Sequence, residues 1–175
     1  MKSVRRGALV GFLLLMVAVT APLVIRWATL PGTRGPSIEV DLPGGVHRVV
    51  DLQQMQGMSS LTRYAEAQNQ FGNWRDGGTY TGVLLADLLD GAVYSSVMVE
   101  ASDGYRVTIE RERVVSEAFP MVLAYAMDGA EVPDWRDGFR IVVLPVGGRV
   151  SNEEYQAVSA GSYWARNVVR IAAQP

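Results

Sequence analysis

The sequence predicts an α+β domain with a mostly β core and short helices. Many short apolar or alternating segments, rich in β-branched and aromatic residues, have the length and pattern of strands. Turn residues separate these segments, and the stretches with helical periodicity are short. The sequence has no regular alternation of strands with long helices and no G-x-G-x-x-G or P-loop spacing, so a doubly wound nucleotide-binding fold is not expected.

The expected strands are the short segments in which β-branched or aromatic residues dominate: Ile38–Val40, Val46–Val50, Ser59–Gln68, Tyr80–Val83, Val97–Ala101, Tyr105–Ile109, Met121–Ala126, Phe139–Leu144 and Trp164–Ala172. The turn Ser102-Asp103-Gly104 predicts a hairpin between two of them. Met121–Ala126 and Phe139–Leu144 are predicted to be buried, because nearly all of their side chains are apolar.

Short helices are expected between some of these strands. Asp51 is a suitable N-cap for the first helix. Gly82 is expected to allow a tight turn from a strand into the helix Leu84–Leu89, whose leucines form one buried stripe and which Gly91 could end as a C-cap. Arg111–Ala118 predicts a short charged helix.

The N-terminal run Gly7–Ile25 predicts insertion into a membrane. Its nineteen residues carry no charge and would form a helix about 28 Å long, close to the thickness of a bilayer's hydrocarbon core. No clear small-x-small cleavage site follows, and Arg26 and Trp27 are typical of an interfacial anchor, so a retained single-pass anchor is favoured over a cleaved signal peptide. Basic residues before the run favour a domain on the extracytoplasmic side.

The predicted organisation is an anchor or signal segment at 1–28, a Pro- and Gly-rich linker at 29–37, and a globular domain at 38–175. After Pro36 the chain has eighteen acidic residues and eleven arginines, a net charge of −7. A domain that acidic is a poor partner for nucleic acid, which is bound by clustered Lys and Arg.

Missing residue types exclude several common chemistries. The chain has no cysteine, so disulfides, thiolate nucleophiles and thiolate metal sites are ruled out. His47 is the only histidine, which excludes two-histidine zinc sites within one chain. It lies in an alternating strand and is expected at the surface. No catalytic residue and no metal ligand are predicted.

Four segments, taken in order, resemble signatures of the oxidoreductase molybdopterin-binding domain, the fold of sulfite oxidases: Tyr80–Leu89, Ala101–Tyr105, Val122–Gly129, and Gly138–Val143 with Pro145. The resemblance spans nearly the whole domain, from Ile38 to Ile171, and implies the same β-rich fold. Turn glycines and buried apolar residues account for the shared positions, so the segments indicate the fold more than the activity.

In that family, the resemblance implies, molybdenum is held by a pterin dithiolene and one cysteine thiolate, and basic residues near an Arg-x-x-Lys-Trp segment hold the cofactor's phosphate. Here Ser59, Ser60 or Asp51 would have to replace the thiolate. Ala160–Trp164 keeps the tryptophan and lacks both charges. No bound cofactor is therefore expected, with molybdopterin as the alternative. The candidates to contact it are Arg63, Arg75, Tyr105 and Arg140.

Aromatic residues in or beside turns are the preferred binding site. The turn-rich segment Phe71–Gly78 is expected to be a loop, and a second loop surrounds Trp135. The candidates for contact with a protein partner are Phe71, Trp74, Tyr80, Trp135, Tyr163 and Trp164. Glu131, Asp134 and Asp137 form either a cation site or a solvated loop.

These features favour a membrane-tethered extracytoplasmic domain without bound molybdenum, which acts as a binding or accessory subunit of a membrane assembly. Two alternatives remain at this point. One is a molybdopterin oxidoreductase with a non-cysteine metal ligand, and the other is a small-ligand-binding or sensor domain in which an apolar pocket replaces the cofactor site.

Overall fold

The computed structural model of the chain describes residues 35–89 and 91–175, which belong to one compact unit, Thr33–Pro175. Strands dominate this unit, and its helices are only four or five residues long. The elements in chain order are β1 (Ser37–Leu42), β2 (Val46–Asp51), α1 (Leu52–Gln56), β3 (Ser60–Gln68), β4 (Trp74–Leu84), α2 (Leu85–Leu88), β5 (Ser96–Ala101), β6 (Arg106–Glu110), α3 (Arg111–Val114), β7 (Met121–Met127), β8 (Ala130–Glu131), β9 (Arg140–Val143), β10 (Arg149–Val150), a 3₁₀ helix (Ala160–Tyr163) and β11 (Val168–Gln174). The predicted mostly β core is confirmed, whereas the helical part of the α+β expectation is small.

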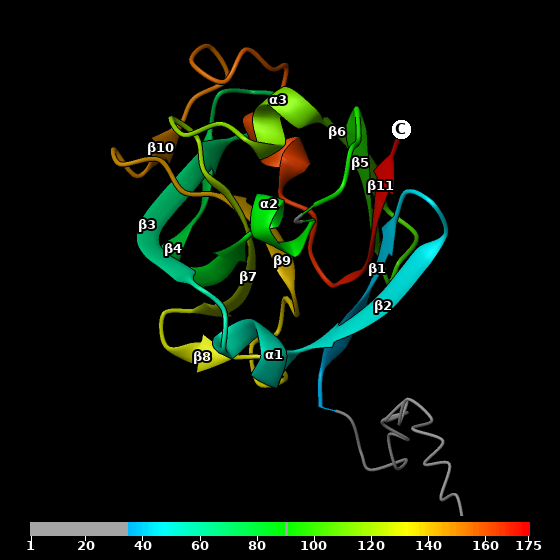
Figure 1. Ribbon diagram of the computed structural model, residues 1–175. Helices are drawn as coiled ribbons and strands as arrows, with labels where there is room; N and C mark the ends of the chain where they lie inside the picture. The colour runs from blue at the N-terminus through cyan, green and yellow to red at the C-terminus, as the bar shows by residue number, and fades with distance from the viewer. Residues whose placement is uncertain (1–34, 90) are drawn as a thin grey trace, which may run out of the picture. The chain divides into compact units, whose positions relative to one another are not determined.

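The strands form two sheets (Figure 1). The first has the order β2-β1-β11-β5-β6, and the second has the order β10-β3-β4-β7-β8. β9 also pairs with β7, along the same edge as β8. Most neighbours are antiparallel, but β1 and β11 run parallel, as do β10 and β3. The parallel pairing of β1 with β11 means that the first and last strands of the domain lie side by side.

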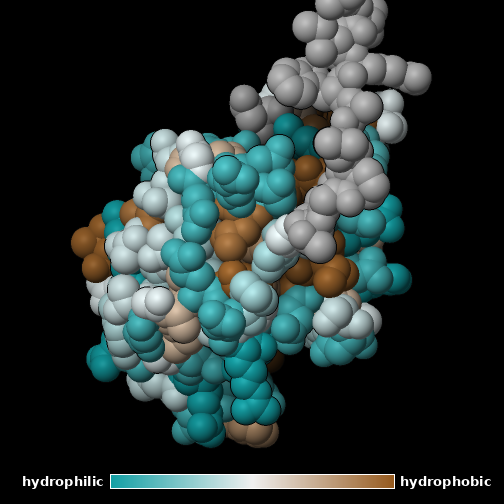
Figure 2. Space-filling view, turned by 90° about the horizontal axis from the view of Figure 1, so that it is seen from below, coloured by the Kyte–Doolittle hydropathy of each residue, from teal (hydrophilic) through white to brown (hydrophobic). Residues whose placement is uncertain are grey.

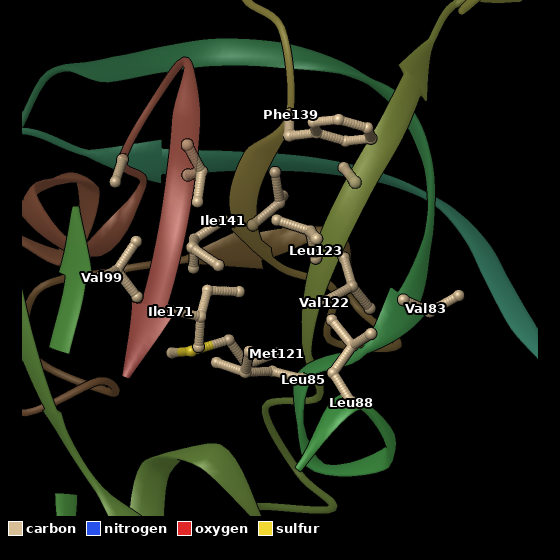
Figure 3. Close-up of a cluster of buried hydrophobic side chains, with 14 of the residues drawn as sticks. Val83, Leu85, Leu88, Val99, Met121, Val122, Leu123, Phe139, Ile141 and Ile171 are labelled. Atoms are coloured by element: carbon tan, nitrogen blue, oxygen red, sulfur yellow. The ribbon is translucent and has the colours of Figure 1, made fainter. Parts of the chain in front are cut away.

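One hydrophobic core lies between the sheets and takes residues from both. In Figure 3, Ile171 of β11 lies beside Met121 of β7 and Ile141 of β9. All seven positions of β7 except the last are buried, as are all four of β9, which explains why both sequences are so apolar. Because every core residue among those described lies within Thr33–Pro175, we expect this unit to fold as an isolated domain.

The role of Gly82 differs from the one expected. It lies inside β4, at an irregularity in the pairing with β7, and does not form the turn into α2. A Cβ atom at this position would lie 2.4 Å from the carbonyl oxygen of Leu123 and 2.6 Å from Cα of Ala124. The glycine is therefore needed because the backbone of β7 passes so closely.

The segment Phe71–Gly78, expected as a loop, forms much of a hairpin between β3 and β4. Trp74 pairs with Gln68, so the strand begins there and only the tip turns. Asn69 organises this tip, because its side-chain oxygen accepts hydrogen bonds from the backbone N–H groups of Phe71 and Asn73, each 3.0 Å long.

The helices and the last strand are shorter than expected. The predicted cap of α1 is confirmed: the Asp51 carboxylate accepts from the N–H of Gln54 at 2.8 Å, and the Gln54 side chain accepts from the N–H of Asp51. The helix predicted at Arg111–Ala118 ends at Val114, with Val115 as its C-cap. The strand predicted at Trp164–Ala172 begins at Val168, since Asn167 adopts a positive φ of 50° and turns the chain.

In residues 35–89 and 91–175, none of the helices combines the length and apolar character needed to cross a bilayer. The predicted anchor Gly7–Ile25 and residues 29–34 of the predicted linker lie outside the described residues.

Candidate functional site

Arg140, on β9, is the only charged residue that is buried in the described part of the chain, with 1% of its surface exposed. Its Nη2 donates to Oδ2 of Asp76 at 2.6 Å, and its Nη1 donates to Oδ2 of Asp137 at 3.0 Å. The exposed Arg166 also pairs with both carboxylates. We call these four residues the arginine–aspartate cluster; its formal charges cancel.

Aromatic rings surround the buried guanidinium. Its Cζ lies 5.8 Å from the ring centre of Tyr80 and 5.5 Å from that of Trp164. Tyr80 also packs against Trp135, with 6.0 Å between ring centres. The Tyr80 hydroxyl donates to the backbone oxygen of Asp76 at 2.5 Å, and burial raises the pKa of Tyr80 to about 12.

The burial of these rings corrects the predicted partner surface. Tyr80, Trp135 and Trp164 are 0%, 7% and 4% exposed, so they belong to the interior and cannot contact a partner at the surface. Tyr80 and Trp164 pack around the Arg140 side chain, and Trp135 packs against Tyr80, an arrangement that the sequence alone did not indicate.

A hollow of about 250 Å³ lies beside the cluster. Asp103, Tyr105, Ser162 and Trp164 line it together with members of the cluster. The Tyr105 hydroxyl donates to the backbone oxygen of Ser162 at 2.6 Å, and partial burial raises the pKa of this tyrosine. Three of the segments discussed for the family resemblance thus meet here: the turn at Asp103, the strand of Arg140 and the segment that ends at Trp164.

The residues at this hollow do not fit a molybdopterin cofactor. Its wall carries the carboxylates of Asp76 and Asp103 against one arginine, Arg166, so a phosphate dianion would meet a net negative charge. Arg140 cannot compensate, because both of its Nη atoms bind aspartates and its Nε, which has no hydrogen-bond partner among the described residues, is buried. The sequence offers no thiolate.

The remaining predicted cofactor contacts lie apart from this hollow. Arg75 is exposed and makes no ion pair with any described residue. The Asp51 carboxylate is engaged as the cap of α1. Ser59, Ser60 and Arg63 do come together, in a separate apolar cavity of about 380 Å³.

The β3–β4 hairpin exposes three aromatic rings. Phe71 at its tip is 78% exposed, and Tyr64 and Trp74 are 50% and 36% exposed. Arg149, from β10, places its Cζ 5.1 Å from the ring centre of Trp74 and donates from Nε to Glu66 at 2.8 Å. We call Tyr64, Phe71, Trp74 and Arg149 the hairpin surface.

The sequence indicated Phe71 and Trp74 but missed Tyr64 and Arg149. The signal for Tyr64 was the alternation in β3, where Ala65 and Ala67 are buried and their neighbours face outward. Arg149 could not be placed beside Trp74 from the sequence, because the parallel pairing of β10 with β3 joins distant segments.

Tyr163, the last predicted partner contact, is half-buried in another aromatic group. Its ring centre lies 5.4 Å from that of Tyr155, and Arg113 stacks over both rings at 5.0 and 4.4 Å. Arg113 also donates to the backbone oxygen of Tyr155 at 2.8 Å. Arg113 thus already occupies the faces of the Tyr155 and Tyr163 rings, where a cation of a partner would otherwise bind.

The other charged candidates are also accounted for. Among the described residues, no group of three or more His, Asp or Glu side chains could hold a metal ion. Asp137 binds Arg140, and Glu131 accepts from Gln56 at 3.1 Å, so these two carboxylates are engaged with other side chains of the protein. His47 lies at the surface, as expected, 2.6 Å from Asp41.

The surface between these features is mainly hydrophilic. Figure 2 shows one face of the molecule, on which apolar groups reach the surface in patches separated by hydrophilic side chains. Exposed apolar groups are typical of binding surfaces, and the hairpin surface exposes three large rings on one hairpin.

Comparison with known proteins supports the fold. No known family model matches the chain, and no curated protein matches it. Among solved structures, the chain is similar to the sulfane dehydrogenase SoxCD from Paracoccus pantotrophus, with a TM-score of 0.57 and 14% sequence identity. The match covers 84% of this chain and 40% of that chain. At this identity the similarity shows the fold alone, which agrees with the sulfite oxidase-like fold expected from the sequence.

Proposed function

We propose that the chain is a non-catalytic relative of the molybdopterin-binding oxidoreductases, held at the extracytoplasmic membrane surface by Gly7–Ile25. In this proposal it is an accessory subunit that binds a protein partner in a membrane assembly. The observation that carries the proposal is the hairpin surface, where Phe71, Trp74 and Tyr64 are exposed on one hairpin beside Arg149.

The proposal that the chain has no catalytic activity rests on the arginine–aspartate cluster. In the related enzymes, as the sequence resemblance implies, a thiolate and basic side chains hold the molybdenum cofactor. The chain has no cysteine, and Asp76 and Asp137 neutralise the buried Arg140. The position that would need positive charge for a phosphate is therefore internally compensated.

The composition of the hairpin surface supports contact with a protein. Tyr, Trp, Phe and Arg are enriched at the centres of protein interfaces, where large rings are removed from water. A membrane anchor would add to the affinity, because it raises the effective concentration of the domain near a partner in the same membrane. The proposal needs only modest intrinsic affinity for this reason.

A photo-crosslinking experiment with the full chain in its native membrane tests the partner. A photoreactive amino acid replaces Phe71 in one variant and Val93, which is 87% exposed, in the control. We expect one defined protein adduct from position 71 and none from position 93. Equal, diffuse labelling from both positions would overturn the proposed contact.

Metal and pterin analysis tests the lack of catalysis. The full chain is purified from cells that make molybdopterin, and molybdenum is measured per mole of protein. We expect only trace amounts. Stoichiometric molybdenum would support the alternative, an oxidoreductase with a non-cysteine metal ligand.

Fractionation tests the tether. Full-length chain should stay in the membrane pellet after extraction at high pH, and its mass should include residues 1–28. Release of a shorter chain into the soluble fraction would support a cleaved signal and a secreted domain.

The apolar cavity near Arg63 favours a second candidate function, a small-ligand-binding domain.

A further inference from the structure

The apolar cavity lies between the start of β3, the end of β4 with α2, and the segment after α3. Its apolar lining residues are Leu61, Leu84, Ala86, Val114, Val115 and Pro120. Its volume of about 380 Å³ falls within the usual range for small-molecule sites of roughly 300–1,000 Å³. The space equals that of about a dozen water molecules, so it suits a compact organic molecule.

Arg63 is the cation of this cavity. Its Nη1 donates to the backbone oxygen of Leu144 at 2.8 Å, which fixes the orientation of the half-buried guanidinium. Within the described ranges, no carboxylate lies within 4.0 Å of it, in contrast to Arg140. A guanidinium has five N–H donors in a planar fork, so most of those of Arg63 remain for a carboxylate.

Two hydroxyl groups extend this polar side. Ser59 and Ser60 also line the cavity, both are exposed, and neither side chain makes a hydrogen bond to another described residue. Serine hydroxyls donate and accept, so they can complete the hydrogen bonds of a bound carboxylate. Arg63, Ser59 and Ser60 therefore supply hydrogen-bonding groups at the start of β3, while Val115 and Pro120 of the segment after α3 are apolar.

Glu117 limits the charge of a suitable ligand. Its side chain lies in the lining and is exposed. Glu117 and Arg63 are the two charged residues of the lining, so its formal net charge is zero. The domain as a whole has an excess of acidic residues. A single negative charge close to Arg63 is tolerated in this setting, but a second charge toward Glu117 would be repelled.

We propose that this cavity binds a small monocarboxylate with an apolar body, its carboxylate on Arg63 and the hydroxyls of Ser59 and Ser60, its body against Leu84 and Val115. This inference goes beyond the proposed accessory role and does not depend on it. It assigns a ligand class to a cavity that lies apart from the arginine–aspartate cluster.

Titration of the isolated domain Thr33–Pro175 tests the class, with heteronuclear NMR to locate the binding. The probe is octanoate. Octanol has the same chain without the charge, acetate has the charge without the chain, and octyltrimethylammonium reverses the charge. We expect octanoate to bind at least about tenfold more tightly than any of the three, as loss of a charge-assisted hydrogen bond implies.

Two variants test the site. Arg63→Met should weaken octanoate binding by about tenfold or more and leave octanol binding unchanged. Val115→Trp fills the cavity from an exposed position, so it should abolish binding without unfolding the domain. Arg149→Met, on the hairpin surface, is the matched control and should change neither affinity.

Each other outcome overturns the proposal in a defined way. Equal binding of octanol and octanoate would make the cavity a merely apolar site, and equal binding of acetate would make Arg63 a simple surface anion site. No binding of octanoate at millimolar concentration, or binding unaffected by Arg63→Met and Val115→Trp, would remove the site altogether. A molybdenum-loaded chain would refute the proposed accessory role and leave these results unchanged.

Discussion

Arg140 donates from Nη2 to Oδ2 of Asp76 across 2.6 Å, and this contact joins β9 to β4 across 64 positions of sequence. Asp76 itself has a positive φ of 59°, a conformation that Asp tolerates better than most residues. Only 1% of the arginine's surface is exposed, so its charge serves to hold strands and loops together.

Replacing Arg140 should destabilise the domain strongly. Arg140→Met removes the buried cation from Asp76 and Asp137. Breaking a buried pair costs about 3–5 kcal/mol, and we expect a loss of about 2–3 kcal/mol because Arg166 still pairs with both partly exposed carboxylates. Urea unfolding of the isolated domain measures the loss. Arg166→Met is the matched control: Arg166 binds the same carboxylates from a 47% exposed position and should cost less than about 1 kcal/mol. Equal losses would show that burial of Arg140 has no special effect.

Gly82→Ala should be one of the most damaging small substitutions. The added Cβ would lie 2.4 Å from the carbonyl oxygen of Leu123, so β4 and β7 would have to separate at the centre of their sheet. We expect a loss of about 3 kcal/mol or more, measured by thermal unfolding. Gly129→Ala is the comparison, since nothing lies within 4 Å of its Cβ position and only its φ of +84° opposes the change. It should cost about 1–2 kcal/mol.

The two most buried tyrosine hydroxyls should respond oppositely to removal. The Tyr155 hydroxyl has no hydrogen-bond partner among the described residues, so Tyr155→Phe should leave stability at neutral pH unchanged or raise it by up to about 1 kcal/mol. Tyr80→Phe removes the donor to Asp76 and should cost about 1 kcal/mol. Denaturant unfolding of both variants checks this contrast, and a marked loss from Tyr155→Phe would reveal a partner for its hydroxyl.

The domain should lose stability as the pH rises above about 10. Burial raises the pKa of both Tyr80 and Tyr155 to about 12, whereas a tyrosine in the unfolded chain titrates near 10.0. The unfolded state therefore releases protons first, so the stability present below pH 10 falls as the pH rises toward 12. Unfolding free energies measured across this range should fall less steeply in the Tyr80→Phe, Tyr155→Phe double variant. An unchanged slope would assign the alkaline loss to other groups.

Local sequence signals predicted local structure well. Asp51 caps α1 as predicted, and the turn at Gly104, with a φ of +86°, joins β5 to β6 as expected. The apolar runs of β7 and β9 are buried strands. Each of these features depends on residues only a few positions apart, which a sequence displays directly.

Features that depend on distant partners could not be predicted. The start of β4 looked like a loop because Gly77 and Gly78 are turn residues, and only pairing with β3 makes it extended. The burial of Trp164 depends on Tyr80 and Arg140. The pairing of Arg140 with Asp137 joins residues only three positions apart in the sequence. Nothing in the sequence near these two residues indicates that Asp76 is the second partner of Arg140.

The position of β1 has a mechanical consequence. β1 is the first strand of the domain and lies between β2 and β11, hydrogen-bonded to both. A force applied to the chain at Ser37 acts along β1. It therefore loads the hydrogen bonds to both neighbouring strands at once, in shear, and does not break them one after another. Forced unfolding is governed by the barrier to this sliding motion, so the domain is built to bear tension from its N-terminal side.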